Sequence, residues 1–210
     1  MAHLIKAIYD TTVPNAVNVL ENTHELIVER AIATQNKIDT DSTTWGAQLK
    51  RLDVSLPSGE LLVKRPKEKF VEIINILATV ERTISALKWL SETYPTSILR
   101  ECHPSTSDAI GGNDIVLTDI SKNIIVRCEV TDVVSSNASQ NGKEKTALKN
   151  LECANSVPDD SIFRYIATSA EFADALSSPN RKWDNMHYQY IRHETGLKNK
   201  TVLLEIKSKN

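Results

Sequence analysis

One long amphipathic segment limits the fold of this chain more than any other feature. Between Pro66 and about Tyr94 the apolar residues recur three and four positions apart, and Pro95 follows directly. This spacing places them on one stripe of a helix, while proline suits a first turn and ends a helix that reaches it. The sequence therefore predicts a helix over residues 66–94, whose apolar face must pack against another layer. The apolar positions are Phe70, Ile73, Ile74, Leu77, Val80, Ile84, Leu87 and Leu90.

A second segment of the same kind precedes it. Apolar residues recur at helical spacing from Pro14 to about Gln35, which predicts an amphipathic helix with Pro14 in its first turn. Residues 38–46 are rich in Asp, Ser and Thr, and residues 52–63 have the composition of two short extended pieces around a turn. The N-terminal portion is therefore expected to be mainly helical.

The pattern changes after Pro104, where β-branched residues gather in short runs. Asp114–Thr118 and Ile124–Val134 flank a polar turn, which predicts a β-hairpin. A helix over Lys143–Asn155 should follow, because its alanines and leucines mark one face. The remaining expected elements are a strand at Ile162–Thr168, a short helix to Leu176 with a capping box formed by Thr168 and Glu171, and a final strand at Thr201–Ile206.

This order of elements indicates an α/β fold with a mixed central sheet, flanking helices and an N-terminal helical portion. We assign the helical portion to residues 1–100 and the α/β core to residues 101–210, joined in one compact unit. The composition is that of a globular protein, because 40% of the residues are hydrophobic and 25% are charged. Aromatic residues make up only 5%, so Ile, Leu and Val must fill the core.

Cysteine usage and the N-terminus favour the cytoplasm. Cys102, Cys128 and Cys153 are far apart and odd in number, so the sequence indicates neither a disulfide framework nor a zinc site. The first residues lack a cationic segment leading into a long apolar stretch, and no run of 18 apolar residues occurs. We therefore expect a cytoplasmic protein that does not insert into a membrane.

Two acidic residues fall on the predicted hairpin. Asp114 opens one strand and Glu129 lies near the middle of the other, so antiparallel pairing can bring their side chains to one end of the sheet. Two carboxylates so close together repel each other unless a cation stabilises the pair. Mg²⁺ is the physiological ion that prefers oxygen ligands. Bound Mg²⁺ can polarise a phosphodiester oxygen and lower the pKa of an attacking water. The sequence thus suggests a magnesium site at Asp114 and Glu129.

The residues around this pair resemble the motif of a known family. The chain reads Gly111-Gly112-Asn113-Asp114, later Cys128-Glu129-Val130-Thr131, and then a lysine-rich helix and a strand. Over Pro104 to Thr168 this arrangement resembles the PD-(D/E)xK nuclease superfamily, which includes most type II restriction endonucleases. In that family the first aspartate opens a hairpin strand, the second acidic residue lies on its neighbour, and a lysine two residues later orients or activates the attacking water.

Thr131 stands where the family's lysine would be, and its hydroxyl carries no charge. Residues two apart share a strand face, so Thr131 is expected beside Glu129, where its hydroxyl or a bound water offers a further ligand. Either the site is inactive or another residue supplies the charge. Some members of the superfamily carry the lysine on the following helix, so Lys145 or Lys149 is the candidate to assist the water.

The resemblance implies a Mg²⁺-dependent endonuclease that cuts double-stranded DNA, in particular a type II restriction enzyme working as a homodimer. The formal net charge of −2 makes no global case for DNA binding, so phosphate contacts would fall to local basic clusters. Such clusters lie at residues 64–69 and 181–183 and among the C-terminal lysines. The long helix and the N-terminal helix are candidates for the subunit interface.

Two other classes of function fit the same residues. One is a member of the fold that binds DNA or a protein without catalysis, which the change at Thr131 suggests directly. The other is an unrelated α/β interaction or regulatory protein, in which the long amphipathic helix is the functional element. Asp114 would then simply start a strand after a Gly-Gly turn, Glu129 would be a solvated residue on an edge strand, and Lys145 and Lys149 would belong to a solvated helix face.

Overall fold

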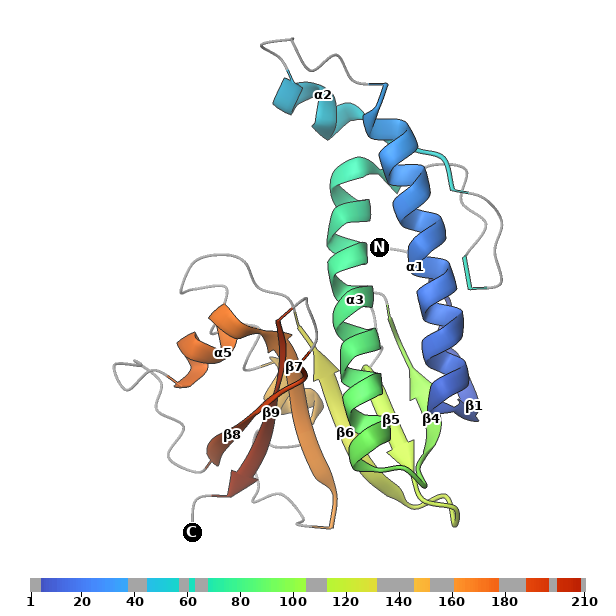
Figure 1. The fold of residues 1–210 in the computed structure, drawn as a ribbon. Coiled ribbons are helices and arrows are strands. Elements are labelled where there is room, and N and C mark those ends of the chain that lie inside the picture. The colour runs from blue at the N-terminus through green and yellow to red at the C-terminus, as the bar shows by residue number, and fades with distance from the viewer. Residues whose placement is uncertain are drawn as a thin grey trace.

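The computed structural model describes residues 5–37, 45–56, 61–62, 68–104, 113–131, 146–151, 161–177, 188–196 and 200–208 (Figure 1). Its helices are α1 (Val13–Gln35), α2 (Trp45–Arg51), α3 (Phe70–Thr93) and α5 (Ala170–Ser177), and residues 146–150 form a further short helix. Its strands are β1 (Ile8–Thr12), β2 (Asp53–Val54), β3 (Glu68–Lys69), β4 (Ile98–Cys102), β5 (Ile115–Thr118), β6 (Ile124–Val130), β7 (Phe163–Ser169), β8 (Tyr188–Glu194) and β9 (Thr201–Ser208).

Among the described residues, seven strands form one mixed sheet in the order β1-β4-β5-β6-β7-β9-β8. Neighbouring strands run antiparallel except β6 and β7, which are parallel. A parallel pair needs a crossover connection, and the short helix at residues 146–150 lies in this one. β2 and β3 pair separately. The expected α/β class with a mixed sheet is therefore confirmed.

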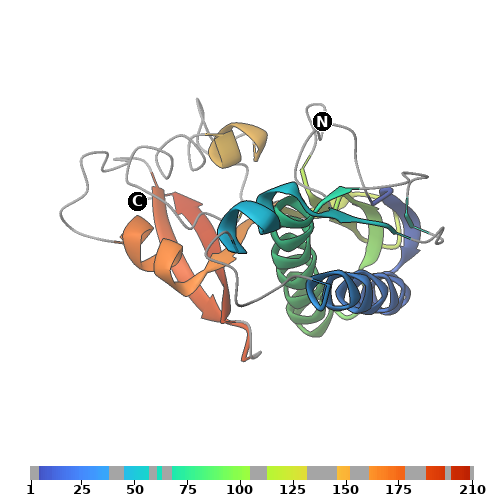
Figure 2. The same cartoon turned by 90° about the horizontal axis from the view of Figure 1, so that it is seen from above.

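Helices α1 and α3 lie side by side along one face of the sheet (Figures 1 and 2). Their apolar stripes meet β4, β5, β6 and β7 in one core, in which each fully buried Leu or Ile contributes about 1.5–3 kcal/mol. Lys88 of α3 and Glu21 of α1 form an ion pair of 2.6 Å across the helix contact. Most of the apolar stripe predicted for α3 is thus buried within the chain itself, but Ile74, which was predicted to belong to it, is exposed. The core includes Leu20, Ile27, Ile73, Leu87, Leu99, Leu117, Cys128 and Tyr165.

The short helix at residues 146–150 and α5 cover the opposite face, as Figure 2 shows from above. Here Leu148, Leu151 and Phe172 pack on Ile166 of β7 and Leu204 of β9 in a second core. Neighbouring residues of β7 therefore serve different cores, because successive side chains of a strand point to opposite faces. The sheet carries helices on both faces, and β7 and β9 contribute residues to both cores.

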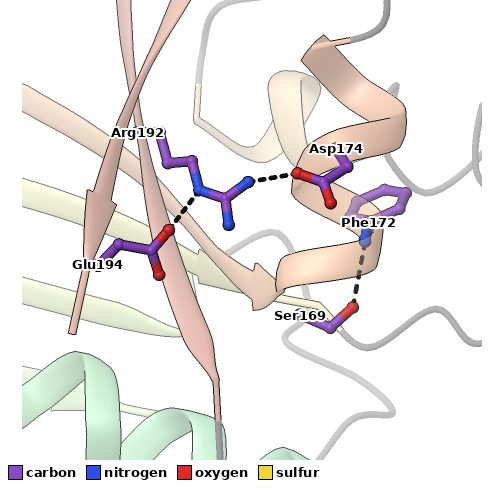
Figure 3. Close-up of polar contacts among 5 residues, drawn as sticks. All are labelled: Ser169, Phe172, Asp174, Arg192 and Glu194. Carbon is purple, nitrogen blue, oxygen red and sulfur yellow. Dashed lines mark hydrogen bonds and ion pairs between the residues drawn. The ribbon is translucent and has the colours of Figure 1, made fainter. Parts of the chain in front are cut away.

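Helix α5 begins one residue later than the predicted capping box requires. Thr168 and Ser169 both pair with β9, so the strand continues through the residue expected to cap the helix. Ser169 takes the cap, because its Oγ accepts a hydrogen bond of 3.2 Å from the Phe172 N–H (Figure 3). The capping box of Thr168 and Glu171 is therefore wrong. Arg192 of β8 bridges Asp174 and Glu194, which ties α5 to the edge of the sheet (Figure 3).

Several other element limits differ from the prediction. Helix α3 starts at Phe70 rather than Pro66, because Glu68 and Lys69 pair with β2 instead. Strand β6 ends at Val130, and residues 132–134 of the predicted strand lie outside the described residues. Strands β1, β4 and β8 were not predicted. The boundary proposed at residue 100 falls inside β4, which pairs with β1 on one side and β5 on the other.

Candidate functional site

The two acidic residues of the predicted site lie next to each other across the β5–β6 ladder. Ile115 of β5 pairs with Cys128 of β6, so Asp114 and Glu129 are the next residues beyond this pair on the two antiparallel strands. Directly opposed residues in such a ladder have Cβ atoms about 4.5–5.5 Å apart. Glu129 is only 7% exposed, and Asp114 is half-buried. The hairpin thus places a pair of carboxyl groups in a mostly buried position.

Each carboxyl group is held by a hydrogen bond from a different element. The Val130 N–H donates to Oδ2 of Asp114 over 2.7 Å, which ties the residue before β5 to the end of β6. The side-chain amide of Asn150, from the short helix above the sheet, donates to Oε2 of Glu129 over 3.0 Å. Glu129 Oε1 is buried and has no hydrogen-bond partner within the described part of the chain.

Burial and mutual repulsion raise the pKa of both acids. For Asp114, desolvation raises the pKa to about 7, opposed by the hydrogen bond from Val130. For Glu129, desolvation and then the charge of Asp114 raise the pKa to about 8, opposed by hydrogen bonds from Asn150 and from the Asp114 backbone. The apo protein therefore prefers to keep at least one proton on the pair near neutral pH. A cation close to both groups would reverse this preference.

A second set of polar contacts surrounds the pair. In the amide orientation that pairs both of its polar atoms, Asn113 donates to the Asn150 carbonyl over 3.1 Å. Its amide oxygen then accepts from Nη1 of Arg127, also over 3.1 Å. Asn113 is 3% exposed. Asn150 is consequently joined to both strands, through its side chain to Glu129 and through its backbone to the residue before Asp114.

Arg164 fixes the end of the same short helix. This β7 residue is buried, and its Nε donates to the Leu151 carbonyl over 3.0 Å. Its Nη1 donates to the Ile162 carbonyl over 2.8 Å. A positive group at the C-terminal end of a helix satisfies carbonyls that lack a helical partner and complements the helix dipole. Arg164 therefore holds the turn that carries Asn150 against the sheet.

The other residues predicted for the site are Thr131, Lys149 and Lys145. Thr131 directly follows β6, is half-buried, and donates its N–H to the Ala167 carbonyl over 2.9 Å. Lys149 is exposed on the short helix, one residue before Asn150. Within the described residues no hydrogen bond or ion pair joins Lys149 to Asp114 or Glu129; Asn150 makes the contact from this helix. Lys145 lies outside the described residues.

Sequence reasoning missed Asn150 and Asn113. The predicted helix had an apolar face marked by Ala147, Leu148, Leu151 and Ala154, with lysines along one edge. Asn150 stands three residues after Ala147 and one before Leu151, so it occupies the sheet-facing side of that helix. A lone amide among apolar positions was the available signal, because a buried amide needs partners on the surface that it packs against.

A literal E-x-K also occurs at Glu205 and Lys207 on β9, and it lies on the face covered by α3. Glu205 pairs with Tyr165 of β7, and its two oxygens contact Lys207 over 3.2 Å and His193 over 2.9 Å. Trp89 of α3 lies against the His193 ring, with centroids 5.1 Å apart. This cluster therefore stands on the opposite side of the sheet from Asp114 and Glu129.

Comparison of the chain with protein-family models, with curated proteins and with solved structures yields no match. Within the ranges that the structure describes, no group of three or more His, Cys, Asp and Glu residues is arranged to hold a metal ion. Asp114 and Glu129 form a pair rather than a larger cluster. None of the helices in the described ranges has the length and apolar character needed to span a bilayer. Of the predicted basic clusters, Lys69 pairs with Asp53 over 2.6 Å.

Proposed function

We propose that the protein is a Mg²⁺-dependent endonuclease that hydrolyses phosphodiester bonds in double-stranded DNA. The observation that supports it is the buried pair of Asp114 and Glu129, in which Oε1 of Glu129 has no partner among the described residues. An unpaired buried carboxylate oxygen is costly, so its presence favours a ligand at this position. The proposal includes a type II restriction enzyme acting in the cytoplasm.

The residues present suit a divalent cation. Asp114 and Glu129 would hold Mg²⁺, with water and substrate oxygens completing its preferred octahedral shell. When bound, the ion would neutralise charge on the scissile phosphate and make an attacking water more acidic. The raised pKa of both acids agrees with a site that needs a cation, because the pair is unfavourable when both groups are ionised and alone.

The order of elements around the pair also supports the nuclease-like fold. Strands β5 and β6 form the hairpin that carries the acids, the short helix crosses over it, and β7 returns parallel to β6. This is the hairpin, helix and strand order on which the resemblance rests. The restriction endonuclease-like core is therefore part of the proposal, in which Asp114 and Glu129 occupy the positions of the family's two acids.

The group that assists the attacking water is assigned to the helix after the hairpin. Thr131 has no charge to offer, although its position two residues beyond Glu129 lets its hydroxyl or a bound water contribute a ligand. Lys149 stands exposed beside Asn150, on the same turn that reaches Glu129. Lys149 or Lys145 is proposed to supply the positive charge near the phosphate. A homodimer would present two such sites to the two strands of a symmetric DNA sequence.

A second candidate function is DNA or protein binding without catalysis. It is favoured by the neutral side chains next to the acids, because Thr131 replaces the lysine of the family pattern and an uncharged amide contacts Glu129. In that case the pair would have a structural or cation-binding role only. An unrelated interaction protein of the α/β class is the third possibility, and the same experiment separates all three.

The test compares cleavage of plasmid DNA in Mg²⁺ by wild type, Asp114→Ala and Glu129→Ala. Glu92→Ala is the matched control, because Glu92 is an exposed acid at the end of α3. The enzyme would be supported if wild type and the control produce discrete fragments and the cleavage rate falls by a factor of at least about 10² in both site variants. DNA binding in gel-shift assays without cleavage would favour the second function. Absence of both cleavage and binding would overturn the nuclease proposal.

A further inference from the structure

Asn150 links the short helix to the acid pair, and its own chemistry differs from that of the lysine expected there. We infer that Asn150 is a positioning residue, which fixes Glu129 so that Oε1 is presented to a divalent cation. The inference rests on the proposed metal-dependent function and adds a residue that the family pattern does not supply. It names a helix-borne amide, rather than a lysine, as the group that controls Glu129.

The two carboxyl oxygens of Glu129 have different surroundings. A glutamate side chain has several rotatable bonds, so holding one oxygen restricts where the other can point. The Asn150 amide donates to Oε2 over 3.0 Å, whereas Oε1 is buried with no partner in the described ranges. The bond from Asn150 therefore separates the roles of the two oxygens, leaving Oε1 available to a ligand.

The donor, Asn150, is itself held in place by hydrogen bonds. The Asn150 carbonyl accepts from Asn113 over 3.1 Å, and Arg164 donates to the next carbonyl, that of Leu151, over 3.0 Å. These bonds attach the last turn of the short helix to β7 and to the residue before Asp114. Outer-shell groups that orient metal ligands work only when they are fixed themselves, and this one is held from two sides.

The side chain of Asn150 is uncharged, which matters for cation binding. A lysine at this place would pair with Glu129 and compete with a cation for the carboxylate. The neutral amide donates a hydrogen bond without cancelling the charge of the pair. Asn150 thus controls the geometry of Glu129 without a positive charge that would repel a divalent ion.

The experiment measures Mn²⁺ binding by titration calorimetry, with no DNA present, on wild type, Asn150→Ala and Asn75→Ala. Replacing Asn150 is expected to weaken Mn²⁺ binding about 10- to 100-fold, the usual effect of removing an outer-shell partner. Asn75→Ala is the matched control, because it makes the same substitution at an exposed position of α3, on the opposite face of the sheet from the acid pair, and should leave the Mn²⁺ affinity unchanged. Circular dichroism checks that each variant is folded. Asn150→Leu, which keeps the volume but not the donor, replaces Asn150→Ala if the latter does not fold.

A repeat in a Glu129→Gln background distinguishes positioning from general destabilisation. The residual Mn²⁺ affinity then depends on Asp114, and replacing Asn150 should change it less than twofold if Asn150 acts through Glu129. A loss of affinity in both backgrounds would overturn the inference in favour of a merely structural role. Wild-type affinity in Asn150→Ala and Asn150→Leu would overturn it while leaving the proposed function intact. Failure of wild type itself to bind Mn²⁺ would overturn both.

Discussion

The hydroxyl of Tyr94 lies 2.6 Å from the hydroxyl of Tyr165, which joins the residue after α3 to the middle of β7. Tyr165 is almost fully buried, whereas Tyr94 is half-buried. The two residues are 71 positions apart in the chain, so this hydrogen bond connects the helical layer to β7, a strand that contributes to both cores. It also predicts an asymmetry between two otherwise identical substitutions.

Tyr94→Phe should destabilise the protein more than Tyr165→Phe. Removing the Tyr94 hydroxyl leaves the buried Tyr165 hydroxyl unpaired, which costs about 1–3 kcal/mol in the free energy of unfolding. Removing the Tyr165 hydroxyl leaves the Tyr94 hydroxyl partly accessible to water, and the expected cost is about 1 kcal/mol or less. Urea denaturation of both variants measures the difference. Equal losses in the free energy of unfolding would show that the Tyr165 hydroxyl finds another hydrogen-bond partner when Tyr94 is replaced.

The apo protein should lose stability as the pH rises. The pKa of Asp114 is raised to about 7 and that of Glu129 to about 8 in the folded state, above their ordinary values. The folded state therefore binds protons more tightly than the unfolded state, and this contribution, complete below about pH 4, is lost as the pH rises to about 8. Urea denaturation in chelator across this range should give a falling free energy of unfolding. The variant Asp114→Asn with Glu129→Gln should flatten the decline, and an equally steep decline in it would assign the effect to other groups.

A divalent cation should reverse that loss at alkaline pH. Mg²⁺ or Mn²⁺ bound only by the folded protein at about a hundred times its dissociation constant adds about 2.7 kcal/mol to stability. At about pH 8 the melting temperature should therefore rise when the ion is added and fall again with chelator. The increase should be smaller in Asp114→Asn, and an undiminished increase would place the ion elsewhere.

The cap of α5 predicts opposite outcomes for two neighbouring hydroxyl residues. Ser169→Ala removes the oxygen that accepts from the Phe172 N–H and should cost about 0.5–2 kcal/mol. Thr168→Val should be neutral or stabilising, because the Thr168 hydroxyl is fully buried and has no partner within the described ranges. Thermal denaturation of both single variants checks this. A larger cost for Thr168→Val than for Ser169→Ala would restore Thr168 as the cap.

The elements predicted best were those with a strong apolar period. Local residue patterns were enough to predict helices α1 and α3 and the β5–β6 hairpin. Helix α3 differs from its predicted bounds only at its start, where Glu68 and Lys69 pair with β2. Strand β8 was missed because it lies at an edge of the sheet and most of its residues are at least partly exposed. Such a strand lacks the alternation of apolar and polar residues that marks a half-buried one.

The candidate site was predictable in its acids but not in their partners. The hairpin places Asp114 beside Glu129 through local antiparallel pairing, which the sequence pattern already indicates. Asn150 reaches Glu129 only because the chain crosses over the sheet and returns parallel as β7. A contact that depends on a crossover is set by tertiary packing, so helical periodicity drew attention to the neighbouring Lys149 instead.

The pairing of β1 with β4 has a practical consequence for any shortened form of the protein. Ile8–Thr12 lies on the edge of the sheet, with Thr11 opposite Leu99 and Ile8 opposite Cys102. Removing these residues would uncover the backbone amides and carbonyls of β4 and turn a protected inner strand into an exposed one. Unprotected edges recruit strands from other molecules, so such a truncation should self-associate and precipitate even where the acid pair is untouched.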